Sequence, residues 1–186
     1  MTTVTAPPLA TDVSAALRRL YFVRFGFAVV WAGLLFVTAS DLGPVSVTLL
    51  VLYPLFDVAA AVVDSRASKA TGPVRGLYAN IAISSLAGIG LAVAATSGIP
   101  ATLRVWGIWA IVSGLVQLAV GVGRRKLGGQ WAMIASGSIS TLAGASFYLQ
   151  ASAEDASLSS LGGYAILGGI FFLVSALRLG RTTKGS

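Results

Sequence analysis

The sequence has no cysteine and no histidine among its 186 residues. Disulfide bonds and thiolate chemistry are therefore excluded, as are imidazole bases and the commonest ligands of transition metals. The apolar stretches also contain no close pair of carboxylates. Because the usual acids, bases, nucleophiles and metal ligands are missing, we expect no enzyme activity and no bound cofactor or metal.

Charged residues are scarce as well. They make up 10% of the chain, whereas soluble globular domains carry about 25%. Hydrophobic residues make up 56%, and several apolar stretches reach the length of about 18 residues or more that crosses a bilayer. Since a water-facing surface cannot be built from so little charge, the composition predicts an integral membrane protein whose main partner is the lipid bilayer.

The formal net charge of +7 raises the question of nucleic-acid binding. The basic residues, however, stand at the ends of the apolar segments and form no continuous basic face. Their distribution is explained by membrane topology, and we expect no nucleic-acid partner. The sequence leaves open whether a second copy of the chain or another membrane protein is a partner.

Six apolar segments are long enough to cross the membrane as helices. Gly- and Pro-containing turns or charged loops separate them. We predict an all-α membrane protein with a polar N-terminal segment over residues 1–20, a six-helix domain over residues 21–179 and a short tail over residues 180–186. The predicted spans cover residues 21–40, 44–63, 76–96, 103–122, 131–150 and 158–177.

The basic residues also predict an orientation. With the N-terminus inside, twelve of the thirteen lysines and arginines lie on or near the cytoplasmic face, and Arg104 alone falls outside. We therefore expect a bacterial inner-membrane protein with both ends in the cytoplasm. The twelve are Arg18, Arg19, Arg24, Arg66, Lys69, Arg75, Arg124, Arg125, Lys126, Arg178, Arg181 and Lys184.

An alternative interpretation makes the first span a cleaved signal peptide. Two arginines precede its apolar core, and the small residues Thr38, Ala39 and Ser40 stand near its end. Loss of this span would leave an odd number of helices and would break the repeat described next.

An internal repeat of about 55 residues runs through the chain. In the odd-numbered spans, Gly33, Gly88 and Gly144 each follow an alanine and are separated by 55 and 56 residues. In the even-numbered spans, an aromatic residue follows these glycines after 20, 21 and 20 residues, at Tyr53, Trp109 and Tyr164. The repeat predicts three tandem helical hairpins over residues 21–63, 76–122 and 131–177. All three enter the membrane from the same side, so they are parallel repeats.

The even-numbered spans carry three similar motifs: YPLFDVAAAVVDSR at residues 53–66, WAIVSGLVQL at 109–118 and YAILGGIFFLVSALRL at 164–179. With these motifs, nearly the whole chain resembles the HdeD-like family, small bacterial inner-membrane proteins built from short tandem transmembrane repeats. The resemblance implies a role in acid resistance or the stress response. It supplies no catalytic residues, and the absence of histidine argues against direct pH sensing.

Small and polar residues recur every fourth position on two odd-numbered spans. Asn80, Ser84, Gly88 and Ala92 lie on one face of the third span, and Ala132, Ser136, Ser140 and Gly144 on one face of the fifth. Such faces let helices approach closely and form hydrogen bonds across the contact. Helix packing is the simpler interpretation, and a polar lining for a solute path is the alternative. The first span has Phe25 and Val29 at the matching positions, so we expect that copy to pack differently.

Arg24 and Asp57 are the ionisable residues furthest from the loops. Each would cost about 2.5 to 3.5 kcal/mol at a helix centre, and such residues often mark pathways or partners. Arg24 lies about one turn after the start of the first span, and Asp57 lies about two turns before the end of the second. Because the two helices are antiparallel neighbours, both residues are expected at similar depth in the membrane. We predict an intramembrane ion pair, completed by the amide of Asn80 or Gln117. The full candidate polar site is Arg24, Asp57, Asn80, Ser84, Ser113 and Gln117.

Two functions stay open from the sequence. The first is a structural or stress-protective membrane protein without a catalytic site, in which the ion pair holds the helices together. The second is a transporter or channel for a proton, an ion or a small solute, in which Asp57 is the centre of a polar site.

Overall fold

The computed structural model describes residues 8–69, 74–123 and 131–182. These residues form six long α-helices and one short turn of 3₁₀ helix, without a strand in the described ranges. All six helices are long and apolar enough to cross a membrane. The elements are α1 (Pro8–Thr38), α2 (Pro44–Ser68), α3 (Arg75–Ala94), η1 (Ala95–Ser97), α4 (Ile99–Gly123), α5 (Trp131–Gln150) and α6 (Ser159–Thr182).

Several helices begin earlier or end later than the hydropathy predicts. α1 begins at Pro8, inside the segment predicted to be a polar N-terminal extension. Alanine, leucine and arginine fill residues 15–20, and these are good helix formers whether or not lipid surrounds them. α4 begins at Ile99 because Pro100 is tolerated in the first turn of a helix. Apolar character therefore located the spans, and helix propensity extended them.

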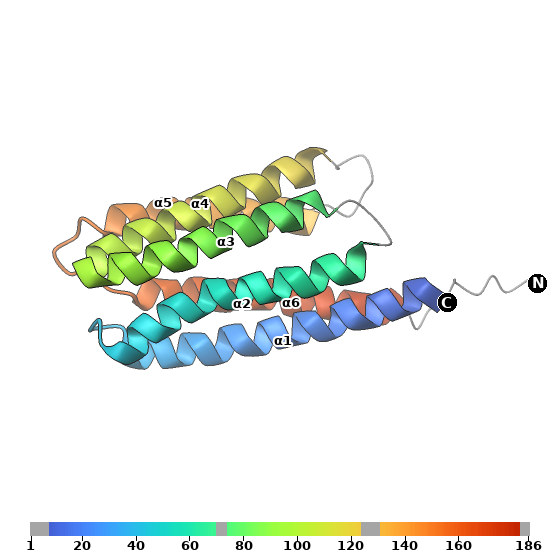
Figure 1. Cartoon of the computed structure of the whole chain (residues 1–186), viewed down its shortest axis with the longest axis horizontal. Helices are drawn as coiled ribbons and strands as arrows, with labels where there is room; N and C mark the ends of the chain where they lie inside the picture. The colour runs from blue at the N-terminus through green and yellow to red at the C-terminus, as the bar shows by residue number, and fades with distance from the viewer. Residues whose placement is uncertain (1–7, 70–73, 124–130, 183–186) are drawn as a thin grey trace, which may run out of the picture.

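The six helices form a closed ring of antiparallel neighbours. Each helix contacts the next along the chain, and α6 returns to contact α1. The start of α1 and the end of α6 therefore lie at the same end of the bundle (Figure 1). We call it the basic end, because six exposed basic residues lie there among the side chains that the structure describes: Arg18, Arg19, Arg66, Lys69, Arg75 and Arg178. The opposite end, where the short turns lie, is called the short-loop end.

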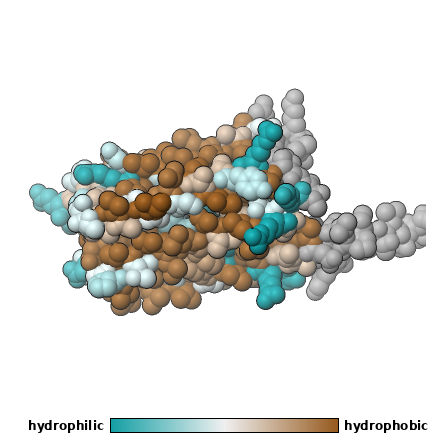
Figure 2. Space-filling view, in the orientation of Figure 1, coloured by the Kyte–Doolittle hydropathy of each residue, from teal (hydrophilic) through white to brown (hydrophobic). Residues whose placement is uncertain are grey.

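The outer surface of the bundle is apolar. Large hydrophobic residues such as Leu86, Leu142 and Leu149 are each at least 70% exposed. Apolar residues cover the middle of the molecule, and hydrophilic residues gather toward its two ends (Figure 2). This pattern is that of a multi-pass membrane protein, since lipid accepts exposed leucine and water does not.

The closest helix pairs are α4 with α5, α1 with α6 and α2 with α3. Glycines make the α4–α5 contact possible. A Cβ atom on Gly144 would lie 2.5 Å from the carbonyl oxygen of Gly107, and one on Gly114 would lie 2.6 Å from that of Gly137. In each case the added Cβ atom would collide with the backbone of the facing helix, which cannot move aside. The three tandem hairpins are compatible with this arrangement, although each helix packs most closely against its neighbour from the adjacent hairpin.

The environments of the repeat glycines differ. A Cβ atom on Gly88 would meet Pro54 and Leu55 of α2 at ordinary contact distance, whereas one on Gly144 would collide with Gly107 and Ile111 of α4. Nothing lies within 4 Å of a Cβ placed on Gly33, which is exposed. The first copy therefore packs differently, as the residues Phe25 and Val29 indicated. Whether the three hairpins superpose remains a prediction.

A packed core closes the short-loop half of the bundle. Trp31 and Trp106 are almost completely buried and stack with ring centroids 5.4 Å apart. The indole N–H of Trp31 donates a 2.6 Å hydrogen bond to the carbonyl oxygen of Leu49. Leucines from α1, α2, α3, α4 and α6, and from the residue just before α6, belong to the same buried cluster as the two rings. They are Leu35, Leu50, Leu91, Leu103, Leu158 and Leu161.

Candidate functional site

The other half of the bundle contains a cavity of about 710 Å³, lined by all six helices. Its walls reach the last residue of α2, Ser68, and the first turns of α3 and α5 at Gly76 and Ala132, so it extends to the basic end. Toward the short-loop end it stops at Tyr53, Trp109 and Tyr164, beyond which lies the core around Trp31 and Trp106. Cavities of about 300 to 1,000 Å³ are typical of small-molecule sites.

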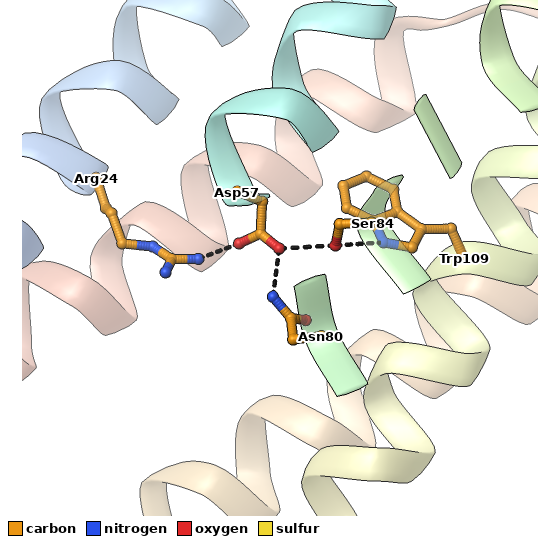
Figure 3. Close-up of polar contacts among 5 residues, drawn as sticks. All are labelled: Arg24, Asp57, Asn80, Ser84 and Trp109. Atoms are coloured by element: carbon orange, nitrogen blue, oxygen red, sulfur yellow. Dashed lines mark hydrogen bonds and ion pairs between the residues drawn. The ribbon is translucent and has the colours of Figure 1, made fainter. Parts of the chain in front are cut away.

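Arg24 and Asp57 form the predicted ion pair, between α1 and α2 in the wall of this cavity (Figure 3). Their side chains are 14% and 13% exposed. The Arg24 guanidinium also lies over the ring of Phe172 from α6, with its carbon 4.1 Å from the ring centroid. The arginine is therefore held on two sides, by a carboxylate and by the face of an aromatic ring.

Two residues of α3 complete the hydrogen bonding of the carboxylate. Asn80 donates to Oδ2 of Asp57 at 2.6 Å, and the Ser84 hydroxyl donates to the same oxygen at 2.8 Å. The indole N–H of Trp109 donates to the Ser84 oxygen at 3.2 Å (Figure 3). The carboxylate thus accepts from Arg24 of α1 and from two donors of α3, and Ser84 links it to Trp109 of α4.

Ser113 and Gln117 line the same cavity from α4. They follow Trp109 in steps of four residues, so all three lie on one helix face, as their spacing indicated. Of the two amides predicted to complete the ion pair, Asn80 does so and Gln117 does not. Within the described residues, the buried hydroxyl of Ser113 has no hydrogen-bond partner. This wall therefore offers polar groups to a bound molecule.

The three repeat aromatics were not included in the candidate polar site, yet all three line the cavity. Tyr164 donates to the Ser140 hydroxyl at 2.8 Å, and Trp109 donates to Ser84 in the corresponding place one repeat earlier. The first copy has Val29 at the corresponding position, without a hydroxyl. The repeat spacing was the signal that could have identified these aromatics as site residues.

The polar face of α5 also lines the cavity, through Ala132, Ser136 and Ser140. Helix packing was the simpler interpretation of this face, and it holds for Gly144, at the α4–α5 contact. The three residues nearer the basic end face the cavity. Phe172, which contacts Arg24, carried no signal in the sequence because α6 contains several equivalent aromatic residues.

In the described part of the chain, no group of three or more Asp, Glu, Cys or His residues lies close enough together to hold a metal ion. Comparison of the sequence and fold with protein-family models, curated proteins and solved structures finds no match. The cavity and the Arg24–Asp57 network are therefore the basis for a functional assignment.

Proposed function

We propose that this protein binds a small solute in the central cavity and carries it across the membrane. The observation that carries the proposal is the 710 Å³ cavity, which is lined by all six helices and contains an ion pair. Ionisable residues inside a membrane domain are costly, and in transport proteins they commonly face a water-filled path. A cavity required only for packing would be smaller and apolar.

The cavity reaches one end of the bundle and is closed at the other by the core around Trp31 and Trp106. A carrier exposes its binding site to one side of the membrane at a time. The arrangement fits a carrier whose site faces the basic end. The distribution of lysine and arginine supports a cytoplasmic basic end in a bacterial inner membrane.

A structural or stress-protective role, which the family resemblance implies, stays a second prediction. It finds support in the hydrogen bonds that tie α1, α2, α3 and α4 together at Asp57. The same bonds are compatible with a carrier, since a binding site also requires fixed side chains. The cavity itself has no use in a purely structural role, and for that reason we favour solute binding.

The test is to fill the cavity. Ser113→Trp places a large ring where Ser113 now lines the cavity, whereas Ala92→Trp adds the same ring at an exposed position near the short-loop end of α3, where the four-residue series has turned away from the cavity. Proteoliposomes loaded with a defined mixture of amino acids, amines, organic acids and sugars are incubated, and the retained solutes are measured by mass spectrometry. We expect wild type and Ala92→Trp to lose at least one solute that Ser113→Trp retains.

Equal retention by wild type, Ser113→Trp and protein-free liposomes would reject the carrier function. Far-ultraviolet circular dichroism and size-exclusion chromatography of both tryptophan variants show that the comparison is made between folded proteins.

A further inference from the structure

We infer that the cavity selects a small amphipathic solute of zero net charge that presents an acceptor oxygen to Arg24. The inference deepens the proposed function and rests on it, because it names the chemical class of the solute. It is argued from the charges that line the cavity, the donors of the Arg24 guanidinium that the ion pair leaves unused and the apolar side chains in the rest of the lining.

The deep part of the cavity carries no net charge. Among the described residues, three charged side chains line it: Arg24, Asp57 and Asp64. The first two neutralise one another. Asp64 lies seven residues further along α2, about 10 Å nearer the basic end at 1.5 Å per residue. A solute with a net charge beside the ion pair would therefore be desolvated without a compensating charge. A neutral solute has no charge to desolvate, and a zwitterion can set its two charges against those of Arg24 and Asp57.

Arg24 offers hydrogen-bond donors that the ion pair does not use. One terminal nitrogen, Nη2, donates to Asp57. A guanidinium has five N–H donors in a fixed plane, and Arg24 lines the cavity, so its remaining donors are available to a bound oxygen. Asp57 and Phe172 hold the guanidinium in place before a solute arrives. A carboxylate or amide oxygen is the acceptor that such a fixed, planar donor group recognises best.

The rest of the wall suits an apolar body. Leu167, Phe171 and Phe172 line the cavity from α6, and Val116 and Val120 line it from α4. Ser113 and Gln117 also line the cavity from α4 and can bond a second polar group. The solute is thus expected to be amphipathic, with its acceptor at Arg24.

The test uses four probes on one skeleton: phenylpropionamide, phenylalanine, phenylpropionate and phenylpropylamine. They are neutral, zwitterionic, anionic and cationic. Binding to the purified protein in detergent is measured by thermal shift and equilibrium dialysis. We expect the amide or phenylalanine to bind wild type at least about tenfold more tightly than either charged probe. Preference for the amide over phenylalanine identifies a neutral solute, and the reverse identifies a zwitterion.

Variants of the pair give a stronger test, because each changes the charge of the site by one. Asp57→Asn leaves Arg24 uncompensated, so phenylpropionate should gain at least about tenfold over the amide. Arg24→Gln leaves Asp57 uncompensated, so phenylpropylamine should gain. The double variant Arg24→Gln with Asp57→Asn is neutral again and should restore the preference for uncharged probes.

Tightest binding of a charged probe to wild type would overturn the inference and leave the solute site standing. An order of preference that is the same in wild type and in the folded single variants would also overturn it. If a single variant fails to fold, wild type and the neutral double variant decide the question. If none of the four probes binds wild type, the proposed solute site fails, and the inference fails with it.

Discussion

Ser84 joins two polar groups that would be costly to leave alone in a membrane interior. Its hydroxyl donates to the Asp57 carboxylate and accepts from the indole N–H of Trp109. The residue is completely buried, so water does not replace either bond. A single small side chain therefore fixes both the charged centre of the site and one of the aromatic residues at the deep end of the cavity.

Replacing this hydroxyl should cost more than replacing its neighbour. Ser84→Ala removes one donor from Asp57 and leaves the Trp109 N–H without its partner, so we expect a loss of about 1 to 2 kcal/mol of stability. Ser85→Ala is the matched control, since the Ser85 hydroxyl donates to the carbonyl oxygen of Ile81 within the same helix and to no other helix among the described residues. That change should stay within about 0.5 kcal/mol. Thermal unfolding in detergent measures both, and equal losses would contradict the role assigned to Ser84.

The ion pair could be predicted from the sequence because it depends on how deep in the membrane each of the two residues lies. Arg24 follows the start of one span, Asp57 precedes the end of the next, and a short turn makes the two helices neighbours. Rotation of a helix about its axis is harder to predict. Gln117 lines the cavity from α4, and depth alone could not decide whether its amide or that of Asn80 bonds to Asp57. Trp109 was not included because an aromatic residue in a membrane helix is ordinary, and its bond to Ser84 depends on how α3 and α4 pack.

At the scale of the helices, close approach of backbones is the main packing device. Gly107 and Gly144 face one another between α4 and α5, and Gly114 and Gly137 do so nearer the basic end. Glycines seven residues apart on one helix lie on the same side, so the two contacts form one continuous seam. Membrane helices gain little from apolar burial against one another, and such seams supply van der Waals contact instead.

The repeat glycines allow a matched test of this seam. A Cβ on Gly144 would lie 2.5 Å from the Gly107 carbonyl oxygen and 2.8 Å from the backbone nitrogen of Ile111. We therefore expect Gly144→Ala to cost about 2 kcal/mol, because the two helices must separate. Gly33→Ala, at the corresponding repeat position, has nothing within 4 Å. It should be neutral or stabilising by up to about 1 kcal/mol, since alanine favours the helix.

Unfolding temperatures of the two variants in the same detergent decide the matter. A Gly33→Ala variant as unstable as Gly144→Ala would show that the α4–α5 seam is not what makes Gly144 sensitive.

The helices themselves were predictable, whereas their pairing was not. Hydropathy located all six because a span requires a run of apolar residues, and the errors at Pro8 and Ile99 arise where helix propensity continues past that run. The predicted hairpins did not specify which neighbouring helices pack most closely. The closest pairs are α2 with α3, α4 with α5 and α6 with α1. That choice depends on the fit of small residues across an interface, which spacing along one helix does not contain.

At the scale of the whole molecule, the bundle has two unlike halves. The half toward the basic end contains the cavity, and the half toward the short-loop end is filled by aromatic and leucine side chains. Exposed basic residues lie mostly on the first half, although Arg124, Arg125, Lys126 and Lys184 lie outside the described residues. Both the opening of the cavity and the positive charge therefore point to the same side of the membrane, so the orientation decides from which compartment the site is reached.

Because the chain has no cysteine, single cysteines report this orientation directly. Arg66 lies at the basic end, and Ser97 and Glu154 lie at the short-loop end, all exposed. Short loops rich in lysine and arginine are retained in the cytoplasm. We therefore expect an impermeant maleimide to label Ser97→Cys and Glu154→Cys in intact cells, and to label Arg66→Cys only after permeabilisation. Labelling of Arg66→Cys in intact cells, with Ser97→Cys protected, would mean that the cavity opens to the outside and that solute enters the carrier from there.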